Sequence, residues 1–379
     1  MNILYVAPSN SIHTKRWINR ASKNGINCYL YDQIPGGGDR IDSCKNTYFV
    51  QKINVFKPLI FLKPLLYTLF HFVKLRKVIK ENDFDLIHIH WLFDFSVLAS
   101  TFQRRIKIVI TPWGSDIQYS PNSNRLRSVK IAFNKFLIRR IARKTDAVCC
   151  DSIAQKEILE KAGAPSKKIH IIYFGTDVNA YSPENRKVNL REKYGANESS
   201  VLVISNRSHE PVYDLETFIR ASKIAYEGNR DLRFVLAGSG SLTSNYKQLI
   251  SELDLKSIYY LPGRMDDEEF SCSTASCDIY VSTSKSDGGL AASTAEAMAS
   301  GLPVLISDFG ENASWLKNES AGMVFPIGDY KKLADQIIML SKNPSDRNQK
   351  GKIGREIISE FNNSEIEWKK VKDMYEKLI

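Results

Sequence analysis

Short apolar segments alternate with helix-length segments along nearly the whole chain, and this alternation constrains the fold more than any other feature. Strands that are apolar at almost every position are typical of parallel sheets with helices on both faces. The pattern occurs twice, which predicts two doubly wound α/β domains. The predicted strands are NILYVA, DLIHIHW, IKIVITPWG and AVCCDS in the first half, and SVLVISN, RFVLAGSG, IYYLPG, DIYVSTS and PVLISDF in the second.

A segment rich in turn-forming residues, YFGTDVNAYSPENRKVN at 173–189, separates the two halves. We therefore expect an N-terminal domain over residues 1–180 and a C-terminal domain over residues 181–363. The last segment, residues 364–379, has apolar residues close to helical spacing. It should form an amphipathic helix that packs back on the N-terminal domain.

Basic residues are concentrated in the first half. Residues 1–180 hold 28 Lys and Arg against 13 Asp and Glu, whereas residues 181–379 hold 25 against 29. This asymmetry predicts an anionic partner for the N-terminal domain. Large apolar residues accompany the basic ones in residues 52–80 and 125–144, a mixture that suits an anionic membrane surface. Nucleic acid is the competing partner, but no recognised binding module is present; a solvated helix face is the third interpretation.

The chain begins MNILYVAPSN, without the basic start and apolar core of a signal peptide. Its longest apolar stretch, residues 58–73, is interrupted by Lys63 and Pro64, so we expect a cytoplasmic protein. The six cysteines lack the spacing of a zinc site and are interpreted as buried thiols. Asp83 and Asp85 form a D-x-D, which we interpret as a turn between a helix and a strand rather than a metal site.

A glycine-rich loop and a short helix follow the predicted strand DIYVSTS, in the sequence SDGGLAASTAEAMASG. The loop lies past the carboxyl end of a buried strand, where open α/β sheets bind ligands. Ser293 or Thr294 can cap the helix, and the free N–H groups at its start suit a phosphate. Glu296, expected in the first turn, can accept hydrogen bonds from a diol such as ribose. The alternative is a glycine turn with a glutamate that balances the helix dipole.

Within this stretch, AEAMASGLPVLIS resembles the donor motif of the retaining glycosyltransferases of family 4, which have GT-B architecture. The resemblance extends to DFGENASWL, SAGMVFPIGD, VLAGSGSL, LPGRM and YFGTDVNAY, and so covers most of the second half. The first half matches more loosely, through IHIHW and TPWGSD. The resemblance implies two Rossmann-like domains facing a central cleft, with a nucleotide-sugar donor bound to the C-terminal domain and an acceptor to the N-terminal domain.

The resemblance also implies roles for single residues. Arg207 follows the strand SVLVISN and matches an arginine that binds the donor diphosphate, a task for which its paired donors suit it; an ordinary surface arginine is the alternative. Glu296 matches the glutamate on the nucleotide ribose. The first glutamate of the motif is replaced by Gly288, with Asp287 the nearest acid, and the usual lysine by about Val212 or Tyr213. The donor-binding residues are then Asp287, Gly288, Gly289, Leu290, Ala291, Ser293, Thr294, Glu296, Gly238 and Arg264.

Histidines mark the candidate site of the N-terminal domain. DLIHIHW places His88 and His90 on one face of a strand, and a metal pair there would need a third ligand that the sequence does not supply. The resemblance makes His90 a catalytic candidate with Arg207 and Glu296, whereas ordinary core histidines are the alternative. The acceptor-binding residues are expected to be His13, Arg16, Trp91 and Asp116.

The expected activity is that of a retaining, hexosyltransferase-type glycosyltransferase. It would move a sugar from a nucleotide-diphospho-sugar, with UDP favoured, to a lipid-linked saccharide used for bacterial O-antigen, capsule or exopolysaccharide. We expect no cofactor and no metal, front-face displacement of the diphosphate, and work at the inner face of the cytoplasmic membrane. The alternatives are a sugar-nucleotide epimerase of the same architecture and a non-catalytic protein that binds nucleotides or nucleic acid.

Overall fold

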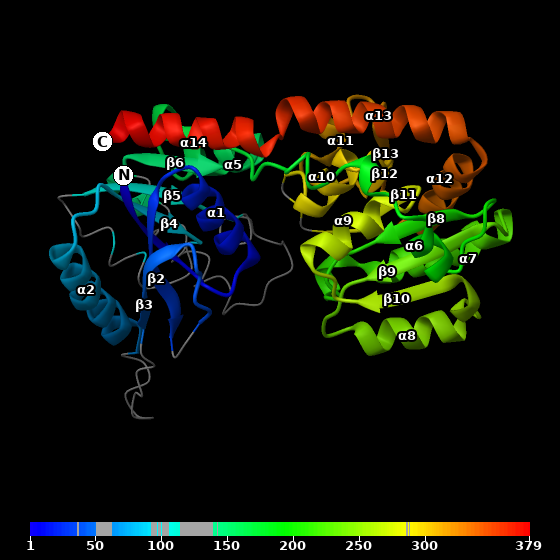
Figure 1. Ribbon diagram of the computed structural model, residues 1–379, viewed down its shortest axis with the longest axis horizontal. Helices are drawn as coiled ribbons and strands as arrows, with labels where there is room; N and C mark the ends of the chain where they lie inside the picture. Colours follow the sequence, from blue (N-terminus) through cyan, green and yellow to red (C-terminus); the bar gives the residue numbers. More distant parts are fainter. Residues whose placement is uncertain are drawn as a thin grey trace. The chain divides into compact units, whose positions relative to one another are not determined.

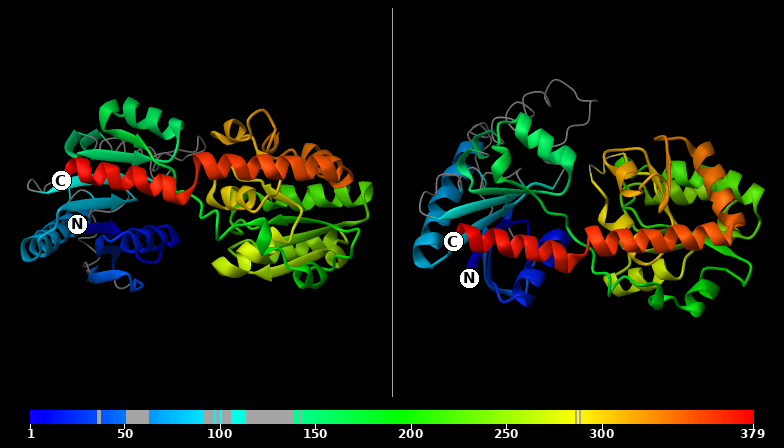
Figure 2. Two further views of the ribbon diagram at one scale, coloured as in Figure 1. Left: turned by 45° about the horizontal axis from the view of Figure 1, so that its top comes forward. Right: turned by 90° about the horizontal axis from the view of Figure 1, so that it is seen from above.

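The computed structural model forms two compact units, each with a parallel sheet covered by helices on both faces (Figures 1 and 2). Unit 1 holds Met1–Ile172 and Trp368–Ile379, and unit 2 holds Tyr173–Glu367. The two Rossmann-like folds predicted from the alternating pattern are confirmed. The structure describes residues 1–35, 38–50, 63–91, 97, 100, 106–113, 139–141, 143–285, 287 and 289–379.

In the described part of unit 1, seven parallel strands follow the order β3-β2-β1-β4-β5-β6-β7. β1 pairs with β2 on one side and with β4 on the other, so the strand order reverses between β1 and β4. The strands are β1 (Asn2–Ala7), β2 (Asn27–Pro35), β3 (Cys44–Val50), β4 (Leu86–His90), β5 (Lys107–Thr111), β6 (Ala147–Cys150) and β7 (Ile169–Ile171).

Helices pack on both faces of this sheet. α1 (Ile12–Lys23) and α14 (Ser364–Leu378) cover one face, where Trp17 and Tyr375 join the buried core. α2 (Lys63–Glu81) and α5 (Ile153–Lys161) cover the other face, to which Leu75 and Leu159 contribute. The sheet is therefore buried on both sides, which explains why its central strands are apolar at nearly every position.

The division between the units falls after Ile172, not after residue 180 as expected. Tyr173, Val178 and Tyr181 pack in a core of unit 2, so the connecting residues belong with that unit. The chain returns to unit 1 at Trp368.

In unit 2 the strand order is β10-β9-β8-β11-β12-β13, and it reverses between β8 and β11. All pairings are parallel within the described residues. The strands are β8 (Val201–Ser205), β9 (Leu232–Ala237), β10 (Tyr259–Gly263), β11 (Ile279–Ser282), β12 (Val304–Ser307) and β13 (Gly322–Phe325).

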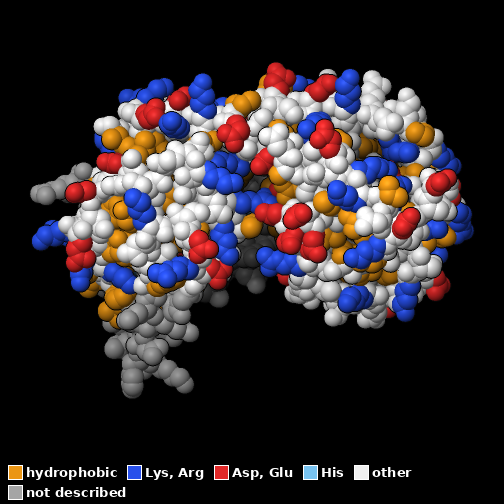
Figure 3. Space-filling model, viewed as in Figure 1, with side chains coloured by type: hydrophobic (Ala, Val, Ile, Leu, Met, Phe, Trp, Pro, Cys, Tyr) orange, Lys and Arg blue, Asp and Glu red, His pale blue; other side chains and the backbone are white. Residues whose placement is uncertain are grey.

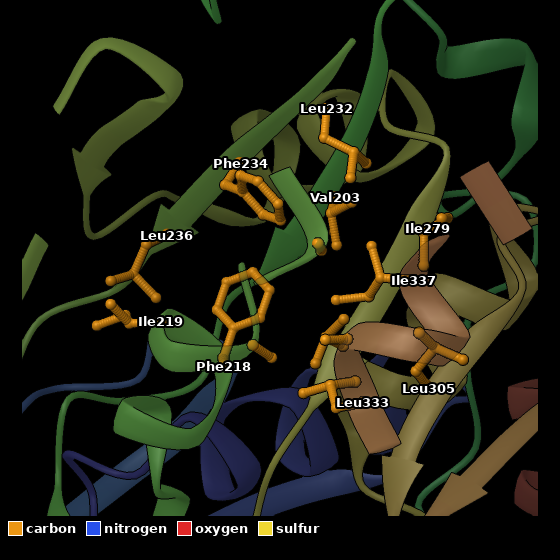
Figure 4. Packing of buried hydrophobic residues seen from close by; sticks show 14 of the residues in the cluster. Val203, Phe218, Ile219, Leu232, Phe234, Leu236, Ile279, Leu305, Leu333 and Ile337 are labelled. Carbon is orange, nitrogen blue, oxygen red and sulfur yellow. The ribbon is translucent and has the colours of Figure 1, made fainter. Parts of the chain in front are cut away.

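A hydrophobic core lies on each face of this sheet. On one face α7 brings Phe218 against Phe234 of β9, with ring centroids 5.9 Å apart, and α12 brings Ile337 (Figure 4). The other face is covered by α9, α10 and α13, with Met298 and Ile358 in its core. The helices of unit 2 are α6 (Val188–Lys193), α7 (Leu215–Gly228), α8 (Thr243–Glu252), α9 (Asp267–Ala275), α10 (Ala292–Ala299), α11 (Asn312–Trp315), α12 (Tyr330–Lys342) and α13 (Pro344–Phe361).

The basic segments expected at a membrane lie only partly within the described residues, since residues 52–62 and 114–138 fall outside them. On α2, Lys77 forms an ion pair with Glu81, at 3.8 Å. On the face seen in Figure 3, Lys and Arg side chains are interspersed with Asp and Glu. No helix in the described ranges is long and apolar enough to cross a membrane.

Candidate functional site

The reversal of strand order in unit 2 marks the candidate site. Ligands of open α/β sheets bind beyond the carboxyl ends of the strands at such a reversal. β8 ends at Ser205 and leads into Asn206 and Arg207, and β11 ends at Ser282 and leads into the glycine loop before α10. Side chains from both segments contact each other there.

Arg207 is the buried centre of this site, only 8% exposed. Its Nη2 donates to Oδ1 of Asp287 at 2.6 Å, and its Nη1 donates to Oγ of Ser293 at 3.0 Å. Its Cζ lies 4.4 Å from the centroid of the Tyr213 ring. Burial lowers the pKa of Arg207, but Asp287, Tyr280 and Tyr213 raise it by more, so the guanidinium keeps its charge. The alternative of a surface arginine is therefore wrong.

Tyr280, in the middle of β11, links the two segments. Its hydroxyl oxygen lies 2.9 Å from Oδ1 of Asn206 and 2.9 Å from Oγ of Ser293. Burial raises the pKa of Tyr280, although the charge of Arg207 opposes this effect. Sequence analysis missed this residue, because a tyrosine inside an apolar strand is typical of the core.

The start of α10 differs from the prediction. The helix begins at Ala292, with Ala291 as its N-cap, and no side chain in the described residues caps it. The expected capping by Ser293 or Thr294 is wrong, because both already lie inside the helix and the Ser293 hydroxyl accepts from Arg207. The N–H groups of the first turn are left without a side-chain cap, which suits an anion.

Glu296 lies in the second turn of α10 rather than in the first, and it is 6% exposed. A carboxylate at this place on α10 can accept hydrogen bonds from ligand hydroxyls. Gly289 is buried and Leu290 packs against the core beneath the loop, whereas Gly288 lies outside the described residues.

A glycine allows the ends of β9 and β8 to approach each other. Gly238 has φ +111°, and a Cβ atom there would lie 2.7 Å from the carbonyl oxygen of Arg207. Arg264, another expected donor-binding residue, is exposed just past the end of β10, two strands away from β8. The structure therefore brings Gly238, but not Arg264, to the backbone of Arg207.

Lys285 is a further cation at this end of the sheet that sequence analysis did not single out. Its backbone N–H donates to the carbonyl of Val212 at 2.9 Å, and its Nζ lies 2.9 Å from Oδ2 of Asp214. It stands on the loop that carries Asp287.

In unit 1, His90 ends β4 at the reversal between β1 and β4. It is fully buried, and neither ring nitrogen has a hydrogen-bond partner within the described residues. Burial, and then the nearby His13, lower the pKa of His90 to about 3. Burial and then Arg16 lower the pKa of His13 to about 4, and the His13 ring lies 5.5 Å from that of Trp113. Both imidazoles are therefore neutral near pH 7.

Trp91, directly after His90, has φ +63°, which is uncommon for a bulky residue and typical of functional sites. Asp116, the other expected contact, lies outside the described residues. His88 is a core histidine: its Nδ1 contacts the Tyr375 hydroxyl at 2.5 Å and its Nε2 contacts Oγ1 of Thr111 at 2.7 Å.

In the ranges that the structure describes, no three His, Cys, Asp or Glu side chains lie together as metal ligands would. Asp83 and Asp85 form the predicted turn between α2 and β4, where Oδ2 of Asp85 accepts from the Asn2 N–H at 2.7 Å. The six cysteines, all within the described residues, form no disulfide, and Cys44 and Cys272 are partly exposed rather than buried.

Two family models match the chain. Residues 187–357 match Glycosyl transferases group 1, and residues 11–180 match Glycosyltransferase Family 4. Among curated proteins, N-acetyl-alpha-D-glucosaminyl L-malate synthase of Bacillus anthracis is 25% identical over 310 residues, 80% of this chain and 77% of that protein. UDP-Gal:alpha-D-GlcNAc-diphosphoundecaprenol alpha-1,3-galactosyltransferase of Escherichia coli is 24% identical over 322 residues, 81% and 79% of the two chains.

Solved structures share the fold over the whole chain. Anabaena HepE in complex with UDP is 18% identical with a TM-score of 0.78, and 100% of each chain is covered. Sucrose-phosphate synthase from Thermosynechococcus elongatus is 15% identical with a TM-score of 0.77, over 100% of this chain and 99% of that one. At these identities the likeness shows the fold alone.

Proposed function

The chain belongs to the glycosyltransferases of family 4, which have the GT-B fold, and on that premise we propose that it transfers a sugar from a nucleotide-diphospho-sugar to a lipid-linked saccharide. A UDP-sugar is the favoured donor, because HepE binds UDP and UDP-glucose and the Escherichia coli relative is named for UDP-Gal. That relative is also named for a diphosphoundecaprenol acceptor, and others are named for amylovoran and colanic acid biosynthesis. The product is then a bacterial surface polysaccharide.

One observation carries the donor part of the proposal: a buried, charged Arg207 lies beside the uncapped start of α10, at the reversal of strand order. A diphosphate suits this place because guanidinium N–H groups and helix N-terminal N–H groups both bind phosphate oxygens. Glu296, further along the same helix, accepts hydrogen bonds from the ribose hydroxyls.

The reaction breaks the bond between the anomeric carbon and the diphosphate oxygen. Arg207 and the α10 N–H groups stabilise the negative charge that develops on the departing diphosphate. The acceptor hydroxyl attacks from the face that the diphosphate leaves and gives its proton to a diphosphate oxygen, so the anomeric configuration is retained. These groups supply the charge stabilisation, and the proposal needs neither a metal ion nor a cofactor.

The acceptor part of the proposal rests on unit 1. Neutral His90 offers a buried donor and acceptor for a sugar hydroxyl, and His13, Arg16, Trp91 and Asp116 are proposed to contact the acceptor with it. We place the enzyme at the inner face of the cytoplasmic membrane, with its basic N-terminal domain toward anionic lipid and no nucleic-acid partner.

A non-catalytic nucleotide-binding protein is the second candidate. The observation that favours it is the ion pair between Arg207 and Asp287. This pair cancels the positive charge of Arg207 that would attract a diphosphate.

Melting temperatures of the wild type and Glu296→Ala test the donor site. UDP, GDP, ADP and CMP are each added with EDTA and with Mg²⁺. A selective rise with UDP that persists in EDTA and disappears in Glu296→Ala supports a metal-free donor site. No rise with any nucleotide contradicts both the transferase and a nucleotide-binding protein, and a rise only with Mg²⁺ contradicts metal independence.

A further inference from the structure

The guanidinium of Arg207 already has partners within the chain itself. Asp287 accepts from Nη2, Ser293 accepts from Nη1, and the Tyr213 ring covers one face. A guanidinium binds phosphate through paired N–H groups. A diphosphate that pairs with both Nη atoms therefore meets a carboxylate and a hydroxyl that already accept from them.

The ion pair between Arg207 and Asp287 is short and buried. The N–O distance is 2.6 Å, and the two side chains are 9% and 12% exposed. Charges in such surroundings are little screened by solvent or salt, so separating them is costly unless another anion replaces the carboxylate.

Lys285, on the loop that carries Asp287, is compensated in the same way. Lys285 is paired with Asp214 at 2.9 Å, although its side chain is 43% exposed. Arg207 and Lys285 thus both carry a carboxylate partner, and neither offers an uncompensated charge to an incoming anion.

We propose that Asp287 is an internal counter-ion that the donor diphosphate must displace from Arg207, so that Asp287 sets the affinity for the donor as a positioning residue. The inference rests on the proposed function, because it takes the diphosphate as the ligand of Arg207. A diphosphate replaces the lost negative charge and also reaches the N–H groups of α10.

The variant Asp287→Asn distinguishes a counter-ion that the diphosphate displaces from a carboxylate that only stabilises the fold. The amide keeps the size of the side chain and an acceptor for Nη2, but it removes the charge with which the diphosphate competes. Arg207 then carries an uncompensated buried charge, which destabilises the free protein and strengthens anion binding. We expect the Kd for a nucleoside diphosphate to fall about tenfold while the melting temperature without ligand also falls. A structural role lowers the melting temperature but cannot tighten binding.

The experiment is isothermal titration calorimetry in EDTA, with inorganic pyrophosphate as a base-independent probe and with UDP, GDP and ADP. The variants are wild type, Asp287→Asn, the charge-conserving Asp287→Glu, and Arg207→Gln combined with Asp287→Asn. Glu216→Gln is the matched control, because Glu216 pairs with Arg220 at 2.8 Å on the exposed surface of α7 in the same unit.

Tighter binding in Asp287→Asn alone, lost when Arg207 is also replaced, supports the inference; Asp287→Glu and Glu216→Gln should bind like the wild type. If the wild type binds a nucleoside diphosphate and Asp287→Asn binds it equally or more weakly, the inference is overturned and the proposed function stands. If no variant binds pyrophosphate or any nucleotide, both are overturned.

Discussion

Tyr213 places its ring against Arg207, with the Cζ atom 4.4 Å from the ring centroid. Tyr213 stands at about the position where the family resemblance leads one to expect a second cation. An aromatic ring therefore occupies about that position, and it packs against the guanidinium of Arg207.

Tyr213→Ala should weaken nucleoside diphosphate binding about fivefold. A cation–π contact of this kind is worth about 1 kcal/mol, and without the ring the guanidinium gains freedom that binding must remove. Tyr213→Phe keeps the ring and is the matched control. Calorimetric Kd values for the two variants check this, and equal weakening in both would mean that the hydroxyl, not the ring, matters.

Arg207→Gln should destabilise unit 2 by about 3 kcal/mol, because it leaves Asp287 charged and without its cation in a mostly buried site. Adding Asp287→Asn should recover most of this loss, since the double variant has no uncompensated charge. Urea denaturation of the single and double variants measures the coupling. Additive losses in the double variant would show that the two side chains do not depend on each other.

Acid should destabilise unit 1 through His90. The pKa of this imidazole is about 3 in the folded chain and about 6.5 when unfolded, so the unfolded chain binds more protons as pH falls. The stabilisation is complete above pH 6.5 and is lost progressively toward pH 3, by about 2 kcal/mol between pH 7 and 5.

Denaturation of the wild type and His90→Asn at pH 7 and pH 5 checks this effect. The variant should lose part of the pH dependence. His170→Asn is the control, because His170 is only partly buried on β7 and should contribute less. An unchanged pH dependence in His90→Asn would show that folding does not change the pKa of His90.

Gly238→Ala should lower both stability and nucleotide affinity. Its Cβ would lie 2.7 Å from the carbonyl oxygen of Arg207, in addition to the strain of φ +111°, for a cost of about 1–3 kcal/mol. Gly195→Ala separates the two effects, since Gly195 has φ +75° with no atom within 4 Å of the added Cβ. Equal melting temperatures for both variants would mean that backbone strain, and not the contact with Arg207, is responsible.

The central strands of both sheets could be predicted from the sequence, because strands that are covered on both faces are apolar at nearly every position. β2 was missed because Asp32, Gln33 and Pro35 interrupt its apolar run, and β7 because it has only three residues on the sheet edge. β13 was missed too, as its four residues include a glycine. Local composition does not reveal strands that are defined by pairing with a neighbour.

In the site, Arg207 could be predicted from the family resemblance and its place after a strand, but its ion pair with Asp287 could not. Asp287 is 80 residues away along the chain, and only the reversal of strand order brings the two together. The cap prediction for Ser293 was wrong for the same reason, since a long-range contact with Arg207 uses the hydroxyl that a local rule assigned to the helix.

The most direct test of the central claim is to incubate the enzyme with a UDP-sugar and a polyprenyl-diphosphate-linked saccharide in EDTA, and to analyse the lipid product by mass spectrometry and NMR. We predict a product larger by one sugar with the anomeric configuration of the donor, formed by the wild type and not by Arg207→Gln. The account would be contradicted if the only product were a free sugar, epimerised or not. It would also be contradicted if no UDP-sugar that the protein binds gave a product.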